Sequence, residues 1–111
     1  MRGGDVVWVP FPHVEDDRLQ SRPAVVLVAG LGPFDLFWAV MITAAVNQPW
    51  VGDVSIDDHE AAGLPIPSRV RTAKLTTLAP ALATPMGRLS DRTWAEVRRK
   101  IGETLTAVTS G

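Results

Sequence analysis

The chain has 111 residues, of which 46% are hydrophobic and 21% charged, a length and composition that predict one folded domain over residues 1–111. It contains no cysteine, which excludes a disulfide framework, thiolate zinc sites and cysteine nucleophiles. The formal net charge is -1, so any nucleic-acid site must rely on a local group of basic side chains.

Strand-like segments alternate with turns through the first half of the chain. Residues 6–11 form an apolar run that ends among prolines and predicts a first strand. Residues 13–21 are polar and show no alternation, so we interpret them as an exposed connection. Residues 24–29 and 36–46 are apolar runs typical of central strands. A turn rich in glycine lies between them, so residues 24–42 are interpreted as two strands and not as a membrane span.

The second half of the chain predicts two further strands. Residues 50–56 alternate in a way that turns Trp50, Val54 and Ile56 inward. Residues 68–75 alternate less regularly and are also interpreted as a strand.

The clearest predicted element is a C-terminal helix with Ser90 as its N-cap. Leu89 and Trp94 have the spacing of a hydrophobic staple around this cap. Glu96 is spaced to pair with Arg92 and Lys100 on the polar side. The apolar stripe that should pack on the sheet consists of Trp94, Val97, Ile101, Leu105 and Val108. About five antiparallel strands and one terminal helix predict a small, mostly β (α+β) fold with a curled sheet.

A series of short motifs runs in order through nearly the whole chain. They are GDVVWVPFP (4–12), SRPAVVL (21–27), MIT (41–43), GLP with PSRVRTAKL (63–75) and GRLS (87–90). This order is similar to that of the MazF/PemK-like toxin family. The resemblance implies an SH3-like barrel, usually a homodimer, that cleaves single-stranded RNA as the toxin of a type II toxin-antitoxin pair, an mRNA interferase. It also implies a cognate antitoxin whose disordered segment folds over the basic site.

Cleavage of RNA without a metal requires a proton acceptor for the 2′-hydroxyl, a proton donor for the leaving oxygen, and positive charge on the phosphorane. The planar, permanently charged guanidinium of arginine suits the last task. By the resemblance, Arg22 matches the family's catalytic arginine and Thr43 its strand-end threonine. His13 and Glu15 are further candidates for proton transfer. His13 and His59 lack the spacing of metal ligands, so we expect no metal and no other cofactor.

The segment from residue 68 to 75 resembles the family's RNA-contacting strand. Its basic side chains are suited to follow a phosphate backbone. Three departures from the family pattern stand against full activity: the acidic residues 15–17, Ala73 in place of an acidic residue, and Thr76 in place of an arginine. The candidate RNA-binding residues are Ser68, Arg69, Arg71 and Lys74.

Other interpretations remain open at the level of sequence. Arg22 alone could be a solvated surface charge, and Thr43 an ordinary strand threonine. The chain could be a catalytically impaired RNA-binding module, a structural interaction domain, or an inhibitor of a protein target such as a topoisomerase. The last is disfavoured because residues 109–111 lack the terminal tryptophan of such inhibitors. The N-terminus leads into a strand without a secretory signal, so we expect a cytoplasmic protein without membrane contact.

Overall fold

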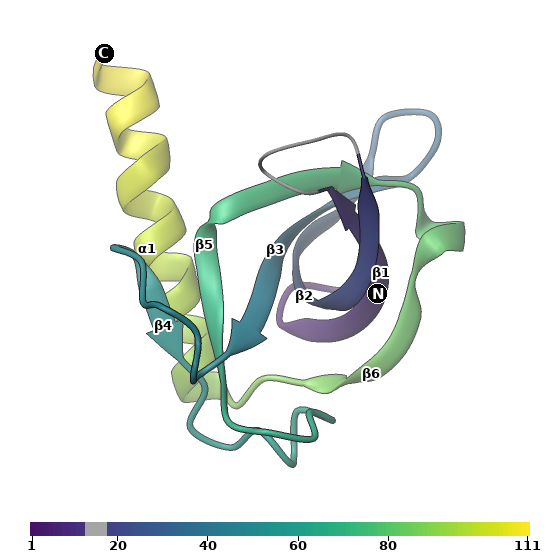
Figure 1. Ribbon diagram of the computed structural model, residues 1–111. Helices are drawn as coiled ribbons and strands as arrows, with labels where there is room; N and C mark the ends of the chain where they lie inside the picture. Colours follow the sequence, from purple (N-terminus) through teal and green to yellow (C-terminus); the bar gives the residue numbers. More distant parts are fainter. Residues whose placement is uncertain (13–17) are drawn as a thin grey trace.

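The computed structural model describes residues 1–12 and 18–111, which form one curled antiparallel sheet and a C-terminal helix (Figure 1). The sheet has six strands in the order β4-β5-β3-β2-β1-β6. The elements are β1 (Asp5–Pro12), β2 (Leu19–Leu31), β3 (Leu36–Ala44), β4 (Asp53–Ser55), β5 (Ser68–Leu78), the short 3-10 helix η1 (Pro80–Leu82), β6 (Thr84–Arg88) and α1 (Asp91–Ser110). The prediction of a mostly β fold with one terminal helix is confirmed, and the sheet is open, with β4 and β6 as edge strands that each pair on one side.

The central strands are buried on both faces, which explains their continuous apolar sequences. Successive residues of a strand point to opposite faces, so Val6 and Val25 belong to one core and Val7 and Val26 to another. The first core is covered by α1, and Val97 of this helix adds a fully buried side chain to that core. The second is built from side chains of β1, β2 and β3.

The ends of several strands differ from the sequence prediction. β2 begins at Leu19, so Arg22 lies inside a strand and not at its edge. Pairing with β3 begins only at Ala24, so Pro23 lies where β2 has a neighbouring strand on one side alone, a position that tolerates a missing N–H. β3 ends at Ala44, and not at residue 46.

The predicted strand over residues 50–56 is only three residues long, Asp53–Ser55. Val54 and Ile56 are buried as expected, but Trp50 precedes the strand and is exposed, so its predicted inward orientation is wrong. β6 was not predicted at all, because Pro85 and Gly87 interrupt its pattern.

The helix begins as predicted and then extends beyond the sheet. The Ser90 hydroxyl oxygen accepts a hydrogen bond from the Thr93 amide at 3.1 Å, which confirms the N-cap. The predicted apolar stripe packs only along its first half, because Leu105 and Val108 are exposed. Glu96 pairs with Arg99 at 2.7 Å, in place of the predicted partners on the polar side. Among the described residues, no helix combines the length and apolar character needed to cross a membrane.

A close contact between two backbones joins the loop before β5 to β6. Gly63 has a positive φ of 80°, and a β-carbon there would overlap the carbonyl group of Met86. A β-carbon on Gly87 would overlap the carbonyl group of Ala62. Both glycines are therefore required by this approach, which places Leu64 next to β6.

Candidate functional site

Arg22 on β2 and Thr43 on β3 lie near the same end of these two neighbouring strands. Ala24 and Met41 form the last residue pair between β2 and β3 at this end, and Arg22 and Thr43 each lie two residues beyond that pair. Both residues line a pocket of about 340 Å³. Its polar wall also includes Gln20, Asn47 and Ser68, and its apolar wall is formed by Trp8, Pro23, Ile42, Leu64, Pro65, Ile66 and Met86.

The guanidinium of Arg22 is partly buried, and its hydrogen-bond partners among the described residues are uncharged. One terminal nitrogen donates to the Met41 sulfur at 3.3 Å, and the other donates to Gln20 Oε1 at 2.7 Å. Sulfur is a weak acceptor, so this contact orients the guanidinium without neutralising it. Neither of these contacts brings a negative charge to Arg22.

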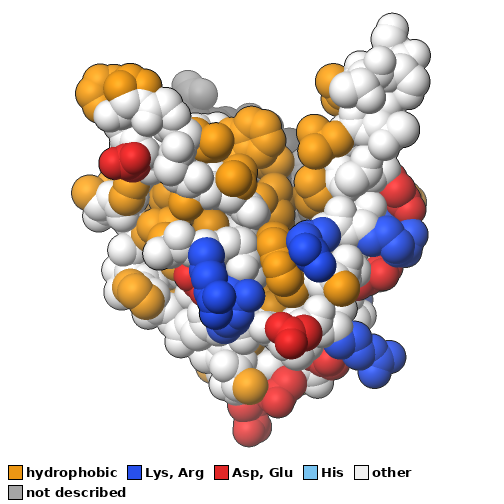
Figure 2. Space-filling view, turned by 180° about the vertical axis from the view of Figure 1, so that it is seen from behind, with side chains coloured by type: hydrophobic (Ala, Val, Ile, Leu, Met, Phe, Trp, Pro, Cys, Tyr) orange, Lys and Arg blue, Asp and Glu red, His pale blue; other side chains and the backbone are white. Residues whose placement is uncertain are grey.

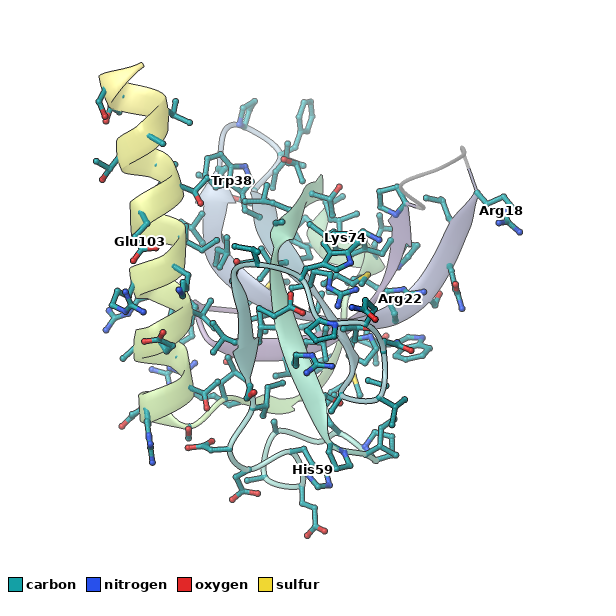
Figure 3. All side chains as sticks on the ribbon, turned by 60° about the vertical axis from the view of Figure 1, so that its left-hand side comes forward. Arg18, Arg22, Trp38, His59, Lys74 and Glu103 are labelled. Atoms are coloured by element: carbon teal, nitrogen blue, oxygen red, sulfur yellow. The ribbon has the colours of Figure 1, made fainter. Side chains whose placement is uncertain are left out.

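Lys74 on β5 lies close to Arg22, as the two labelled side chains in Figure 3 show. Burial lowers the pKa of Lys74 below its ordinary 10.5, and the positive charges of Arg22 and Arg71 lower it further. Within residues 1–12 and 18–111, no carboxylate forms an ion pair with Arg22 or Lys74. Two neighbouring cations without a neutralising carboxylate form a site suited to an anion.

The Thr43 side chain is only 5% exposed, and its hydroxyl oxygen accepts a hydrogen bond from Asn47 Nδ2 at 2.8 Å. Because the amide occupies a lone pair of the oxygen, the hydroxyl proton is left to be donated elsewhere. Thr43 lines the pocket, so a ligand beside Arg22 is placed to accept that proton.

Arg69 and Arg71 hold the loop between β3 and β4 against β5. Arg71 is 6% exposed, donates to the Gln48 carbonyl at 2.7 Å and forms an ion pair with Asp53 at 3.0 Å. Its guanidinium also lies 4.2 Å from the centre of the Trp50 ring. Arg69 donates to the carbonyl oxygens of Ala45 and Asn47.

Asp53 is the acidic partner of both arginines, and its side chain is 5% exposed. Burial alone would raise the pKa of Asp53. Hydrogen bonds from Arg71 and the Trp50 amide, together with the charges of Arg71 and Arg69, instead lower it below 3.8. Arg69 and Arg71 thus share one described acidic partner, whereas Arg22 and Lys74 have none among the described residues.

A family model described as PemK-like, MazF-like toxin of type II toxin-antitoxin systems matches residues 2–105. The chain belongs to this family. Crystal structures of relatives from Deinococcus radiodurans have the same fold. MazF (Form-I) superposes with a TM-score of 0.72 at 22% identity, covering 96% of each chain. MazE-MazF (Form-II) gives 0.66 at 20% identity, covering 95% of this chain and 94% of that chain. A comparison with curated proteins finds no match.

The positions that the family resemblance assigned can now be located in this MazF-like chain. Arg22, Thr43 and Ser68 share the pocket, and Lys74 lies beside Arg22. The Ser68 hydroxyl donates to the Ile66 carbonyl at 2.8 Å. The roles of these side chains in binding RNA or in catalysis stay predictions, as do those of Arg69 and Arg71.

His13 and Glu15 lie outside the described residues. His59 lies in the loop after β4, apart from Arg22 and Lys74 in Figure 3. In the part of the chain that the structure describes, no three histidine, aspartate or glutamate side chains gather as a metal site requires. No described residue is therefore assigned to a metal or cofactor.

Sequence reasoning missed several members of the site, namely Trp8, Gln20, Asn47 and Asp53. Trp8 had a usable signal, because it alternates with the buried Val7 and Val9 and so points to the opposite face. Asn47 had none, because its contact with Thr43 depends on how the loop after β3 folds back.

Proposed function

We propose that this MazF-like protein is an endoribonuclease that cleaves single-stranded RNA without a metal ion. The observation that carries the proposal is the pair of neighbouring cations, Arg22 and Lys74, which have no acidic partner among the described residues, together with the Thr43 hydroxyl in the pocket that Arg22 lines. A phosphodiester supplies the negative charge and the hydrogen-bond acceptors that this arrangement lacks. Membership of the toxin family supports the same assignment.

In the proposed reaction the RNA 2′-hydroxyl attacks the adjacent phosphorus. A new bond forms between the 2′-oxygen and phosphorus, and the bond from phosphorus to the 5′-oxygen breaks, giving a 2′,3′-cyclic phosphate and a 5′-hydroxyl. A base accepts the 2′-hydroxyl proton, and an acid protonates the leaving oxygen. Arg22 stabilises the charge of the phosphorane, with Lys74 adding positive charge, and Thr43 donates to a phosphoryl oxygen. His13 and Glu15 stay the candidates for proton transfer.

We further propose that the protein acts in the cytoplasm as the toxin of a pair, is a homodimer, and is held inactive by an antitoxin. Its relative from D. radiodurans is described as MazE-MazF. The apolar stripe on the second half of α1 is left uncovered at Leu105 and Val108, and hydrophobic side chains gather on the face beside this helix (Figure 2). An uncovered apolar surface of this kind supports association with another chain.

The deciding experiment incubates the purified protein with a long single-stranded RNA in excess EDTA and maps the fragment ends. We expect 2′,3′-cyclic phosphate ends from the wild type. Arg22→Ala should lower the cleavage rate by about a hundredfold or more. Arg22→Lys should recover little, because an ammonium cannot reproduce paired guanidinium donors. Arg98→Ala, on the exposed side of α1, is the matched control and should cleave normally. Intact RNA from folded wild-type protein would reject the proposal.

The role of His13 has a separate test. If His13 transfers a proton, His13→Ala should remove one limb of the pH-rate profile near neutrality. An unchanged profile would leave Glu15 as the remaining candidate.

A second candidate function, binding of RNA without cleavage, is favoured by one observation. Arg69 and Arg71 are engaged by the loop between β3 and β4 and by Asp53, which leaves fewer free cations for catalysis. An RNA-binding module would retain the oligonucleotide but produce no fragments in the same assay. Cleavage and binding measured on one preparation therefore separate the two functions.

A further inference from the structure

The pocket beside Arg22 and Thr43 is larger and more apolar than a phosphate group requires. Its volume is about 340 Å³, and carbon-rich side chains form one whole wall. A phosphate at Arg22 would occupy only its charged edge. The remaining space leaves room for a further group with apolar surface that is attached to that phosphate.

Trp8 is the aromatic member of the apolar wall. It lies on β1 opposite Pro23, the residue that follows Arg22. Its neighbours Val7 and Val9 are buried in the core, whereas Trp8 is turned to the other face and remains 44% exposed. An exposed indole surface beside a phosphate site is the arrangement by which proteins hold unpaired bases.

We propose that this pocket binds one nucleobase of the RNA strand, stacked on Trp8, while the adjoining phosphate lies at Arg22. The inference rests on the proposed function, because it names a subsite for the same substrate. Stacking needs only the flat face of a base, so Trp8 supplies affinity and not the choice of base.

The polar wall of the pocket offers both kinds of hydrogen-bonding group to the edge of such a base. The side-chain amide nitrogen of Asn47 donates a hydrogen bond to Thr43, and the side-chain carbonyl oxygen of Gln20 accepts one from Arg22. The other half of each amide makes no hydrogen bond to another described residue. Asn47 therefore presents an acceptor and Gln20 a donor, as recognition of a base edge requires.

A protein segment is the rival occupant, since an apolar side chain would also fit against Trp8. The nucleobase is favoured because the pocket is lined by Arg22, which lies close to Lys74, and neither cation has an acidic partner among the described residues. Every nucleobase is joined through its sugar to a phosphate, whereas an apolar side chain brings no anion with it.

The test measures binding of a fluorescent 2′-fluoro RNA oligonucleotide, which lacks the attacking hydroxyl, by anisotropy. Trp8→Leu should weaken binding by about tenfold, and Trp8→Phe, which keeps an aromatic ring, should recover most of it. Phe34→Leu removes an exposed aromatic ring from the turn between β2 and β3, at the opposite end of these strands from Arg22 and Thr43, and should leave binding unchanged. Thermal melts of all variants confirm folding.

A second arm places a single abasic nucleotide at successive positions of the oligonucleotide. At the position that faces the pocket, the wild type should lose about tenfold in affinity, and Trp8→Leu should lose little more. Equal affinity of wild type and Trp8→Leu for the intact oligonucleotide would overturn the inference. If Trp8→Leu instead impairs only binding of a protein partner, the pocket serves that partner and the nucleobase subsite is rejected.

The outcomes distinguish this inference from the proposed function. Cleavage of RNA by the wild type without any effect of Trp8 rejects the subsite and leaves the endoribonuclease standing. Binding that depends on Trp8 without cleavage retains the subsite and rejects the endoribonuclease. Absence of both binding and cleavage rejects both.

Discussion

Asn47 donates a hydrogen bond from its side-chain amide to the Thr43 hydroxyl oxygen over 2.8 Å, and thereby restricts where the Thr43 proton can point. The backbone carbonyl of Asn47 is in turn held by Arg69 at 2.6 Å. Arg69 on β5, Asn47 in the loop after β3 and Thr43 on β3 are thus linked by successive hydrogen bonds. Arg69 can influence the site through Asn47 without touching a ligand.

Thr43→Val removes the hydroxyl while keeping the shape of the side chain, and should lower the rate of RNA cleavage by roughly a hundredfold at saturating substrate. Thr43→Ser should retain most of the rate. Asn47→Ala should cause a smaller loss, about tenfold, because the hydroxyl remains but can rotate. Single-turnover kinetics provide the measurement. A Thr43→Val variant as fast as the wild type would remove Thr43 from the mechanism.

Lys74→Met should stabilise the protein at neutral pH while weakening RNA binding. The pKa of Lys74 is lowered by folding, so the unfolded chain holds the proton more tightly and protonated Lys74 costs stability. This cost is present below the folded-state pKa and disappears as the pH rises toward 10.5, so the advantage of Lys74→Met should shrink over that range. Urea denaturation at neutral and alkaline pH checks the sign.

The same Lys74→Met variant should change the salt dependence of binding. The loss of one phosphate contact on a single strand should reduce the slope of log affinity against log salt by about 0.7. Arg98→Met, on the exposed side of α1, serves as the control and should leave the slope unchanged. An unchanged slope for Lys74→Met would place Lys74 away from the RNA.

Asp53→Asn should destabilise the protein by roughly 3 kcal/mol, because it leaves Arg69 and Arg71 without their buried acidic partner. The folded-state pKa of Asp53 is lowered below 3.8, so its contribution is present above that pH and is lost as the pH falls through the folded-state value. The difference between wild type and variant should therefore shrink in acid. Asp35→Asn, in the exposed turn after β2, is the control in denaturant titrations.

Ser90→Ala should lower the free energy of unfolding by about 1 kcal/mol through loss of the helix cap. Ser90→Thr should restore most of it. Ser90→Asp, ordinarily an equally good cap, should perform worse here, because Asp57 Oδ1 lies 2.8 Å from the Ser90 hydroxyl oxygen and a second carboxylate would be repelled. Thermal unfolding followed by circular dichroism ranks the three variants. Equal stability of Ser90→Asp and Ser90→Thr would contradict this account.

Much of the fold could be predicted from the sequence because the decisive patterns are local. The apolar runs of β2 and β3 and the Ser90 cap report burial and helix initiation directly. The irregular alternation in β5 also has a visible cause, since Arg71 pairs opposite Met41 whereas Leu75 pairs opposite Val40, leaving extra residues between.

The site was less accessible from sequence, because its geometry depends on partners far apart in the chain. Arg22 and Arg71 look alike as single residues, yet within the described ranges Arg22 has no acidic partner, whereas Arg71 is anchored by Asp53 and Trp50. No local pattern distinguishes them, since burial and pairing are decided only when β5 meets the loop after β3. The family resemblance could suggest both residues, but not their different surroundings.

The contact of Gly63 with Met86 and of Gly87 with Ala62 explains why two distant glycine motifs belong together. The backbone of the loop at Ala62 and Gly63 occupies the space that a β-carbon on Gly87 would need, and the backbone of Met86 occupies the space that a β-carbon on Gly63 would need. Leu64, which follows this contact, and Met86, which forms it, both line the pocket. The lack of a β-carbon at Gly63 and Gly87 therefore helps to set the width of the pocket. Alanine at either position would push the two backbones apart and shift one wall of the pocket, although neither glycine lines it.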